Sequence, residues 1–124
     1  MKVLVMDDEE NNLHYIDEVL SFIGVETVLV RNSEEAVENY RIAQLKNDIF
    51  DYVILDLVIP NNTGAEATLQ RLKLIDPEVK AILSTEYPKS PVTLNYPDYG
   101  FISVIYKPFI IENVIESLSE IINA

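Results

Sequence analysis

Apolar residues follow two spacings that alternate along the chain. Five short runs are almost continuously apolar, which is typical of strands buried on both faces of a sheet. The predicted strands cover residues 3–6, 27–30, 52–55, 79–83 and 102–106. Elsewhere apolar residues recur every three or four positions, which predicts helices with one buried face. The inward residues are Leu13, Ile16, Leu20 and Ile23 in the first predicted helix, and Ile111, Val114, Ile115, Leu118, Ile121 and Ile122 in the last.

Capping residues place several ends of the predicted helices. Gly24 follows the first helix, at a position where glycine commonly ends one. Asn32 and Ser33 offer an N-cap for the second helix, whose first turn is acidic. The third helix is predicted over residues 65–75, because Pro77 disfavours helical geometry at the residue before it.

The order of these elements predicts the fold class. Strands that alternate with helices favour right-handed βαβ units and a parallel sheet. Five such units in 124 residues predict one domain, residues 1–124, with the flavodoxin-like (βα)5 doubly wound fold and strand order 2-1-3-4-5. In such α/β sheets, ligands bind beyond the carboxyl ends of the strands. The residues that follow each strand are therefore the candidates for function.

Polar side chains occupy those positions. They are Asp7 and Asp8 after the first predicted strand, Asp56 after the third, Ser84 and Thr85 after the fourth, and Lys107 after the fifth. Parallel strands end at the same edge of a sheet, so we expect these side chains to meet at one rim. Each motif alone is more often structural, as a helix cap or a turn. Their joint occurrence at four strand ends favours a functional site.

Three carboxylates cannot lie together uncompensated, because like charges repel strongly at short range. A divalent cation would neutralise Asp7, Asp8 and Asp56, and oxygen ligands favour Mg²⁺, with Mn²⁺ or Ca²⁺ as alternatives. Mg²⁺ uses one or two protein carboxylates, which leaves one aspartate free to form an aspartyl phosphate. Lys107 would add positive charge, and Ser84 a hydrogen bond to a phosphoryl oxygen. The set predicts phosphoryl transfer to Asp56.

Charge and composition narrow the classes of partner. The chain has 9 basic and 21 acidic residues and a net charge of −12, so it would repel nucleic acid and attract basic protein surfaces. Without cysteine, and with His14 as the only histidine, thiolate metal sites are excluded and zinc is disfavoured. His14 lies off the apolar stripe of its helix, and we expect it at the surface.

No segment approaches the roughly 20 apolar residues that cross a bilayer. The start, MKVLVMDD, has an apolar run of only four residues and continues into acids, unlike a signal peptide. We therefore expect a cytoplasmic protein that makes no membrane contact, and the initial methionine favours a natural N-terminus.

Four motifs together resemble the receiver domain of two-component response regulators over essentially the whole chain. They are VLVMDDE at 3–9, VILDLVIP at 53–60 followed by Gly64, ILS at 82–84, and KPF at 107–109. The stretch from Ser84 to Phe109 is similar to receivers of hybrid sensor kinases and phosphorelays. The resemblance implies a signalling domain that accepts a phosphoryl group and is not an enzyme beyond slow self-catalysed phosphorylation and dephosphorylation.

The resemblance also implies a role for each matching residue. Asp56 would be the phosphorylated residue; Asp7, Asp8, Asp56 and the backbone carbonyl of Val58 would hold Mg²⁺; Ser84 and Lys107 would contact the phosphoryl group; and the peptide bond before Pro108 would be cis. A sensor histidine kinase or histidine phosphotransferase would dock on the first helix and the loop after Lys107. In that loop, Ile110 and Ile111 are candidates for docking, and we expect at least one of them in the core. The downstream protein is not indicated.

Three features depart from the common pattern of the family. Val104 stands where receivers often have an aromatic switch residue, so a coupled aromatic rotamer is in doubt. Thr85 stands where a small residue is usual, and it would crowd or modify access to the phosphoryl group. The segment 87–100 contains three prolines, so we expect a short or irregular fourth helix.

Other classes of function remain open to different degrees. A magnesium-dependent phosphatase with an aspartate nucleophile would need a second aspartate where Val58 stands. A flavin-binding electron carrier would need a phosphate loop after the first strand, where this chain is acidic. A receiver-like interaction module that works without phosphorylation is the main alternative, and Val104 and Thr85 keep it open.

Overall fold

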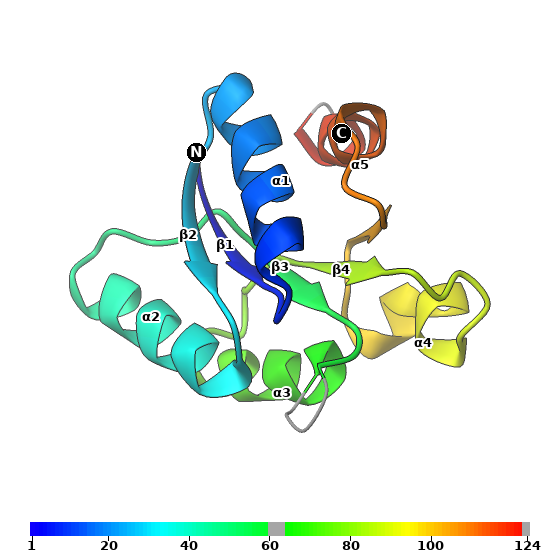
Figure 1. The fold of residues 1–124 in the computed structure, drawn as a ribbon. Coiled ribbons are helices and arrows are strands. Elements are labelled where there is room, and N and C mark those ends of the chain that lie inside the picture. Colours follow the sequence, from blue (N-terminus) through cyan, green and yellow to red (C-terminus); the bar gives the residue numbers. More distant parts are fainter. Residues whose placement is uncertain (60–63, 123–124) are drawn as a thin grey trace.

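The computed structural model describes residues 1–59 and 64–122, with no side chains described beyond residue 120. Pro60, the last residue of the motif at 53–60, therefore lies outside the described residues. Five parallel strands form one sheet in the order β2-β1-β3-β4-β5, as predicted (Figure 1). The strands are β1 (Lys2–Met6), β2 (Glu26–Val30), β3 (Tyr52–Asp56), β4 (Ala81–Thr85) and β5 (Ser103–Tyr106).

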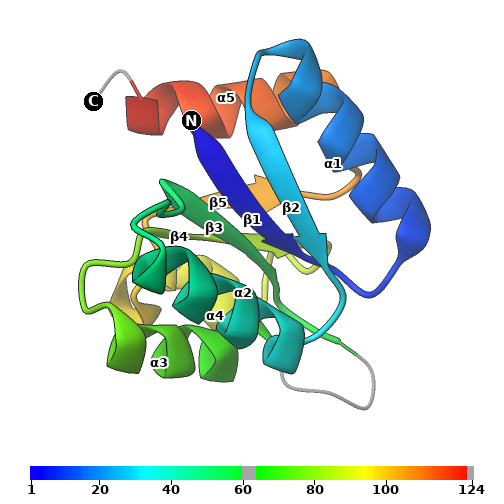
Figure 2. The same cartoon turned by 90° about the vertical axis from the view of Figure 1, so that its left-hand side faces the viewer.

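Helices cover both faces of the sheet (Figure 2). On one face lie α1 (Glu10–Phe22) and α5 (Ile111–Ile122), and on the other lie α2 (Ser33–Leu45), α3 (Ala65–Ile75) and the short α4 (Pro91–Leu94). A 3₁₀ turn, η1 (Tyr96–Tyr99), follows α4. The fourth helix is thus short and irregular, as the prolines predicted, because proline removes a backbone donor from a helix interior.

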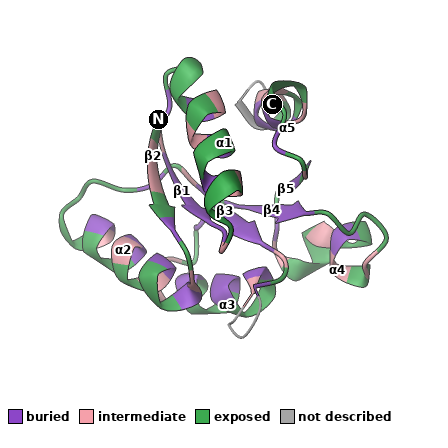
Figure 3. Ribbon diagram, in the orientation of Figure 1, coloured by how far each residue is buried: buried purple, intermediate pink, exposed green. Residues whose placement is uncertain are grey.

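Side chains alternate between two cores, because successive residues of a strand point to opposite faces. Val3 and Val5 of β1 pack with Leu13, Ile16 and Leu20 of α1. Leu4 and Met6 of the same strand pack on the other side, with α2 and α3. The middle strands are buried except at Lys2 and Tyr52, which begin β1 and β3, whereas the helices expose their outer faces (Figure 3). This double burial explains the almost continuous apolar runs in the sequence.

The capping residues predicted at the ends of α1 and α2 have the expected geometry. The side chain of Asn32 accepts a hydrogen bond from the backbone N–H of Glu35 at 2.8 Å and caps α2. Gly24 adopts a left-handed conformation with φ of 83° just after α1. At Gly64, directly before α3, a Cβ atom would collide with the backbone carbonyl of Leu57. The absence of a side chain there lets α3 begin close beneath the loop that follows Asp56.

Several predicted positions were wrong. The fourth strand was predicted over residues 79–83 but runs from Ala81 to Thr85, so Ser84 and Thr85 belong to the strand. Their hydroxyls do not interrupt a ladder of backbone hydrogen bonds, and Asp56 pairs with Ser84 across it. Ile23 lies at the C-cap of α1 and is 38% exposed rather than buried.

Within residues 1–59 and 64–122, no helix is long and apolar enough to span a membrane.

The expectation for Ile110 and Ile111 was also wrong, because both are exposed, at 48% and 36%. Phe109 occupies the core instead, at 3% exposure. One aromatic ring at this turn fills the space between the sheet and α5, so the two isoleucines remain available at the surface.

Candidate functional site

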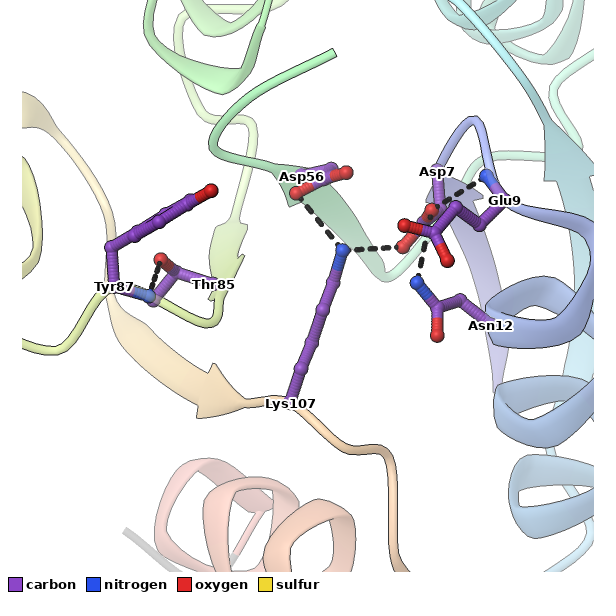
Figure 4. Close-up of polar contacts among 7 residues, drawn as sticks. All are labelled: Asp7, Glu9, Asn12, Asp56, Thr85, Tyr87 and Lys107. Carbon is purple, nitrogen blue, oxygen red and sulfur yellow. Dashed lines mark hydrogen bonds and ion pairs between the residues drawn. The ribbon is translucent and has the colours of Figure 1, made fainter. Parts of the chain in front are cut away.

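The carboxyl ends of four strands meet at the rim predicted from the sequence (Figure 4). Asp7 and Asp8 follow β1, Asp56 ends β3, and Lys107 follows β5. Ser84 lies beside Asp56, because the two residues are partners in the β3–β4 ladder. The parallel order β1-β3-β4-β5 therefore brings together side chains that are as many as 100 positions apart in the sequence.

Lys107 lies between two carboxylates. Its Nζ is 2.8 Å from Oδ2 of Asp7 and 3.1 Å from Oδ1 of Asp56, and Figure 4 shows its side chain reaching between them. The side chains of Asp7 and Asp56 are buried, and that of Lys107 is 9% exposed. Oδ2 of Asp7 accepts no hydrogen bond of good geometry within the described residues. It forms an ion pair with Lys107 instead. The Lys107–Pro108 peptide bond is cis, as the resemblance implies.

The carboxylates of Asp7, Asp8 and Asp56 each place an oxygen within 4.8 Å of the others. Lys107 neutralises only one of these three negative charges. The residual charge and the all-oxygen donor set fit a hard divalent cation such as Mg²⁺. The backbone of Val58 forms a hydrogen bond with the Asp56 carboxylate, which places this residue at the site; the role of its carbonyl as a metal ligand stays a prediction.

Asn12 belongs to the site but was not singled out in the sequence. Its side-chain amide donates to Oδ1 of Asp7 at 3.4 Å, and the backbone N–H of Glu9 donates to the same oxygen at 2.9 Å (Figure 4). The two donors leave Oδ2 of Asp7 directed at Lys107. Its position in the sequence could have indicated this contact. Asn12 lies in the first turn of the helix that follows Asp7, and a side chain there can reach back to that aspartate.

Burial changes the acidity of the central groups. Burial raises the pKa of Asp56 from 3.8 to about 6, and the negative charge of Asp7 adds to this, although Lys107 opposes both. For Lys107, burial acts to lower the pKa, but the carboxylates of Asp7 and Asp56 outweigh it and hold the pKa above its ordinary value. Without a bound cation, ionisation of all three carboxylates is therefore unfavourable.

This acidity predicts a pH-dependent stability difference between the wild type and Asp56→Asn. The raised pKa means that the folded state binds the Asp56 proton more tightly than the unfolded state. Relative to the variant, the wild type should lose stability as pH rises from about 4 to about 6, by as much as about 3 kcal/mol. Urea unfolding between pH 4 and 8 with a chelator measures this difference. Asp98→Asn, an exposed control, should show no such slope, and a pH-independent difference for Asp56→Asn would contradict the prediction.

The hydroxyl of Ser84 is available for a hydrogen bond to a ligand. It is fully buried and has no hydrogen-bond partner in the part of the chain that the structure describes. A buried hydroxyl normally has a partner, and an unpaired one beside Asp56 fits a group that binds there. The hydroxyl of Thr85 is already used, because it accepts a hydrogen bond from the backbone N–H of Tyr87 at 2.8 Å.

Other predicted positions lie around this centre. Val104 is 9% exposed and packs in the core beside α4 and η1, so no aromatic ring occupies the switch position. His14 is exposed on α1, with Nε2 at 3.0 Å from Glu18, as the sequence predicted for a surface residue.

Comparison with known proteins identifies relatives. The family model described as response regulator receiver domain matches residues 3–119. Sporulation initiation phosphotransferase F of Bacillus subtilis (strain 168) is 26% identical over 119 residues, which are 96% of this chain and 91% of that protein. Chemotaxis protein CheY of Thermotoga maritima is 29% identical over 121 residues, which are 97% of this chain and 96% of that protein.

Solved structures show the same fold. The receiver domain of a sensor histidine kinase from Pseudomonas aeruginosa PAO1, which holds a magnesium ion in its active-site cleft, has a TM-score of 0.82 to this chain at 18% identity. The superposition covers 99% of this chain and 98% of that one. Except for Lys2, the family match extends over all five strands, and it includes the whole acidic rim. This chain therefore belongs to the response regulator receiver domain family of two-component signalling proteins.

Proposed function

We propose that Asp56 accepts a phosphoryl group and that its phosphorylation switches an interaction surface. The observation that carries this proposal is the Asp56 carboxylate itself, buried at the rim, 3.1 Å from the Lys107 ammonium and within 4.8 Å of the Asp7 and Asp8 carboxylates. A structural ion pair would need only one of the acids. The three acids would attract one further cation, and Lys107 with the unpaired hydroxyl of Ser84 could contact an anion.

The reaction is a displacement at phosphorus. A carboxylate oxygen of Asp56 forms a bond to phosphorus while the bond to the donor nitrogen of a phosphohistidine breaks, and the imidazole keeps the electron pair and later takes a proton. Lys107 offsets charge on the phosphoryl oxygens, and Ser84 donates a hydrogen bond to one of them. When bound by Asp7, Asp8 and Asp56, Mg²⁺ would supply further positive charge. These residues position the phosphoryl group and neutralise its charge. Because the group ends on Asp56 of the domain itself, the domain is a phosphoacceptor rather than a turnover enzyme.

The donor we propose is a sensor histidine kinase or a histidine phosphotransferase. The name of the Bacillus relative, a phosphotransferase, and the origin of the Pseudomonas neighbour, a sensor histidine kinase with Mg²⁺, are consistent with this class of donor. The two segments proposed for docking carry exposed apolar side chains, namely Tyr15 on α1, and Ile110 and Ile111 after Lys107. We place this exchange in the cytoplasm.

The decisive experiment is intact mass spectrometry after incubation with acetyl phosphate. We expect the wild type to gain the mass of one phosphoryl group with Mg²⁺ and none with a chelator. Asp8→Asn should need at least about tenfold more Mg²⁺ for the same gain, since changes even in outer-shell partners of a metal site commonly cost about 10–100-fold in affinity. Asp98→Asn should match the wild type.

Two results would contradict this proposal. Failure of the wild type to gain mass with acetyl phosphate and with phosphorylated kinases would favour the alternative, an interaction module that works without phosphorylation. An equal Mg²⁺ requirement in Asp8→Asn and the wild type would contradict the metal site.

A further inference from the structure

Tyr87 lies beside the phosphoacceptor, in the segment that joins β4 to α4. It is 50% exposed, and Figure 4 shows its side chain pointing toward Asp56. Its hydroxyl has no hydrogen-bond partner within residues 1–59 and 64–122. Together with Leu57 and Val58, which directly follow Asp56, Tyr87 lines a cavity of about 530 Å³. An unpaired donor on an aromatic ring is therefore available next to the phosphoacceptor.

Hydrogen bonds of the backbone hold Tyr87 in this position. Its N–H donates to Oγ1 of Thr85 at 2.8 Å, and its carbonyl oxygen accepts from the N–H of Ser90 at 3.2 Å. Thr85 is fully buried at the end of β4, so its hydroxyl is a fixed point of attachment. The threonine was expected to crowd or modify access to the phosphoryl group. In the structure, its hydroxyl instead fixes the turn that carries Tyr87.

The other side chains that line this cavity are poorer candidates for contact with a phosphoryl group. Three of them are apolar, and the carboxylate of Glu86 would repel the group. The hydroxyl of Ser90 already caps α4, where it accepts from the backbone N–H of Thr93 at 3.2 Å. Lys89 is the competing donor, and a substitution distinguishes it from Tyr87.

We propose that the hydroxyl of Tyr87 donates a hydrogen bond to an oxygen of the phosphoryl group on Asp56, and that its ring keeps water from that group. This inference rests on the proposed phosphorylation of Asp56. A phosphoryl group has three strong acceptor oxygens, so this contact adds to those of Ser84 and Lys107. Thr85 is a positioning residue, because it acts only through Tyr87.

The contact should lengthen the lifetime of the phosphorylated form. In hydrolysis, a water oxygen forms a bond to phosphorus while the bond to the Asp56 oxygen breaks. The carboxylate keeps the electron pair, and the water loses a proton to solvent. A ring beside the phosphoryl group obstructs the approach of this water, since its apolar carbons offer no hydrogen bond. Removal of the ring should therefore speed hydrolysis more than removal of the hydroxyl alone.

The decay of the phosphorylated protein in Mg²⁺ after removal of acetyl phosphate, followed by intact mass, measures this lifetime. Tyr87→Phe keeps the ring and should shorten the lifetime severalfold, as expected for the loss of one hydrogen bond. Tyr87→Ala should shorten it at least about tenfold. Beryllofluoride, a stable analogue of a phosphoryl group on a carboxylate, tests the contact without hydrolysis. In an NMR titration, Tyr87→Phe should bind it severalfold more weakly than the wild type.

Matched variants separate the hydroxyl of Tyr87 from its surroundings. Tyr99→Phe makes the same change at an exposed tyrosine of η1 and should alter neither the lifetime nor the binding of the analogue. Thr85→Val removes the acceptor of the Tyr87 N–H and should shorten the lifetime, whereas Thr85→Ser keeps the hydroxyl and should retain most of it. Lys89→Met should keep the wild-type lifetime.

The outcomes distinguish this contact from the phosphorylation itself. An unchanged lifetime and unchanged binding of the analogue in Tyr87→Phe would overturn the inference, even though Asp56 is phosphorylated. A loss in Lys89→Met equal to that in Tyr87→Phe would overturn the assignment of the contact to the tyrosine. A wild type that gains no phosphoryl group and binds no beryllofluoride would instead contradict the proposed function, on which this inference rests.

Discussion

Asp56→Asn should gain no phosphoryl group from acetyl phosphate under conditions in which the wild type gains one. An amide is not a nucleophile toward phosphorus, and among the described carboxylates only Asp7 shares the burial and the contact to Lys107 that Asp56 has. Asp7 also contacts Lys107, but it accepts hydrogen bonds from Glu9 and Asn12, which occupy its other oxygen. The expected effect is therefore complete loss, measured by intact mass and by peptide mapping after borohydride reduction.

The control for this variant must show that the rest of the rim is intact. Asp56→Asn should keep the near-ultraviolet circular dichroism of the wild type, because asparagine has nearly the shape of protonated aspartate. Asp98→Asn, in the exposed η1 turn, should be phosphorylated to the wild-type extent. A mass gain of equal size in Asp56→Asn would assign the phosphoryl group to another residue.

Lys107→Met should have the second large effect, on stability and on phosphorylation together. Methionine keeps the apolar stem of the lysine but leaves the buried carboxylates of Asp7 and Asp56 without their cation. Breaking a buried ion pair in this way costs about 3–5 kcal/mol, less whatever is recovered when Asp56 takes up a proton. The rate of phosphoryl gain should fall about 100-fold or more, because a group that stabilises the transferring oxygens is lost. Urea unfolding without metal and timed mass spectra measure the two effects.

Removal of the Lys107 ammonium should raise the affinity for Mg²⁺ even though it slows phosphorylation. Lys107 repels a divalent cation in the same pocket, so Lys107→Met should bind Mg²⁺ more tightly than the wild type, although it is phosphorylated more slowly. Combining Lys107→Met with Asp56→Asn should restore much of the lost stability, since one buried charge fewer is left uncompensated. Lys46→Met, at the exposed C-cap of α2, is the control and should change neither property. Unchanged stability and phosphorylation in Lys107→Met would rule out the role assigned to the lysine.

The local physics of the chain explains why much of the fold could be predicted. Helix α3 was predicted over the residues that it occupies, because the proline after Asp76 acts on its immediate neighbour. The three middle strands were recognisable because burial on both faces leaves almost no polar residue within a run. Where the polar character of a side chain did not match its backbone role, the prediction failed. Ser84 and Thr85 look like loop residues but complete β4, because their backbone groups pair with β3 and β5.

By itself, the sequence determined the alternation of strands and helices, and hence which polar residues stand at strand ends. These are properties of neighbours in the chain. Only the tertiary structure decided that Lys107 contacts both Asp7 and Asp56, that burial raises the pKa of Asp56, and that Phe109 rather than Ile110 enters the core. It also decided that Thr85 holds Tyr87 at a cavity beside the phosphoacceptor. Distances, burial and local charge depend on which segments pack together in space, and a one-dimensional pattern does not contain that information.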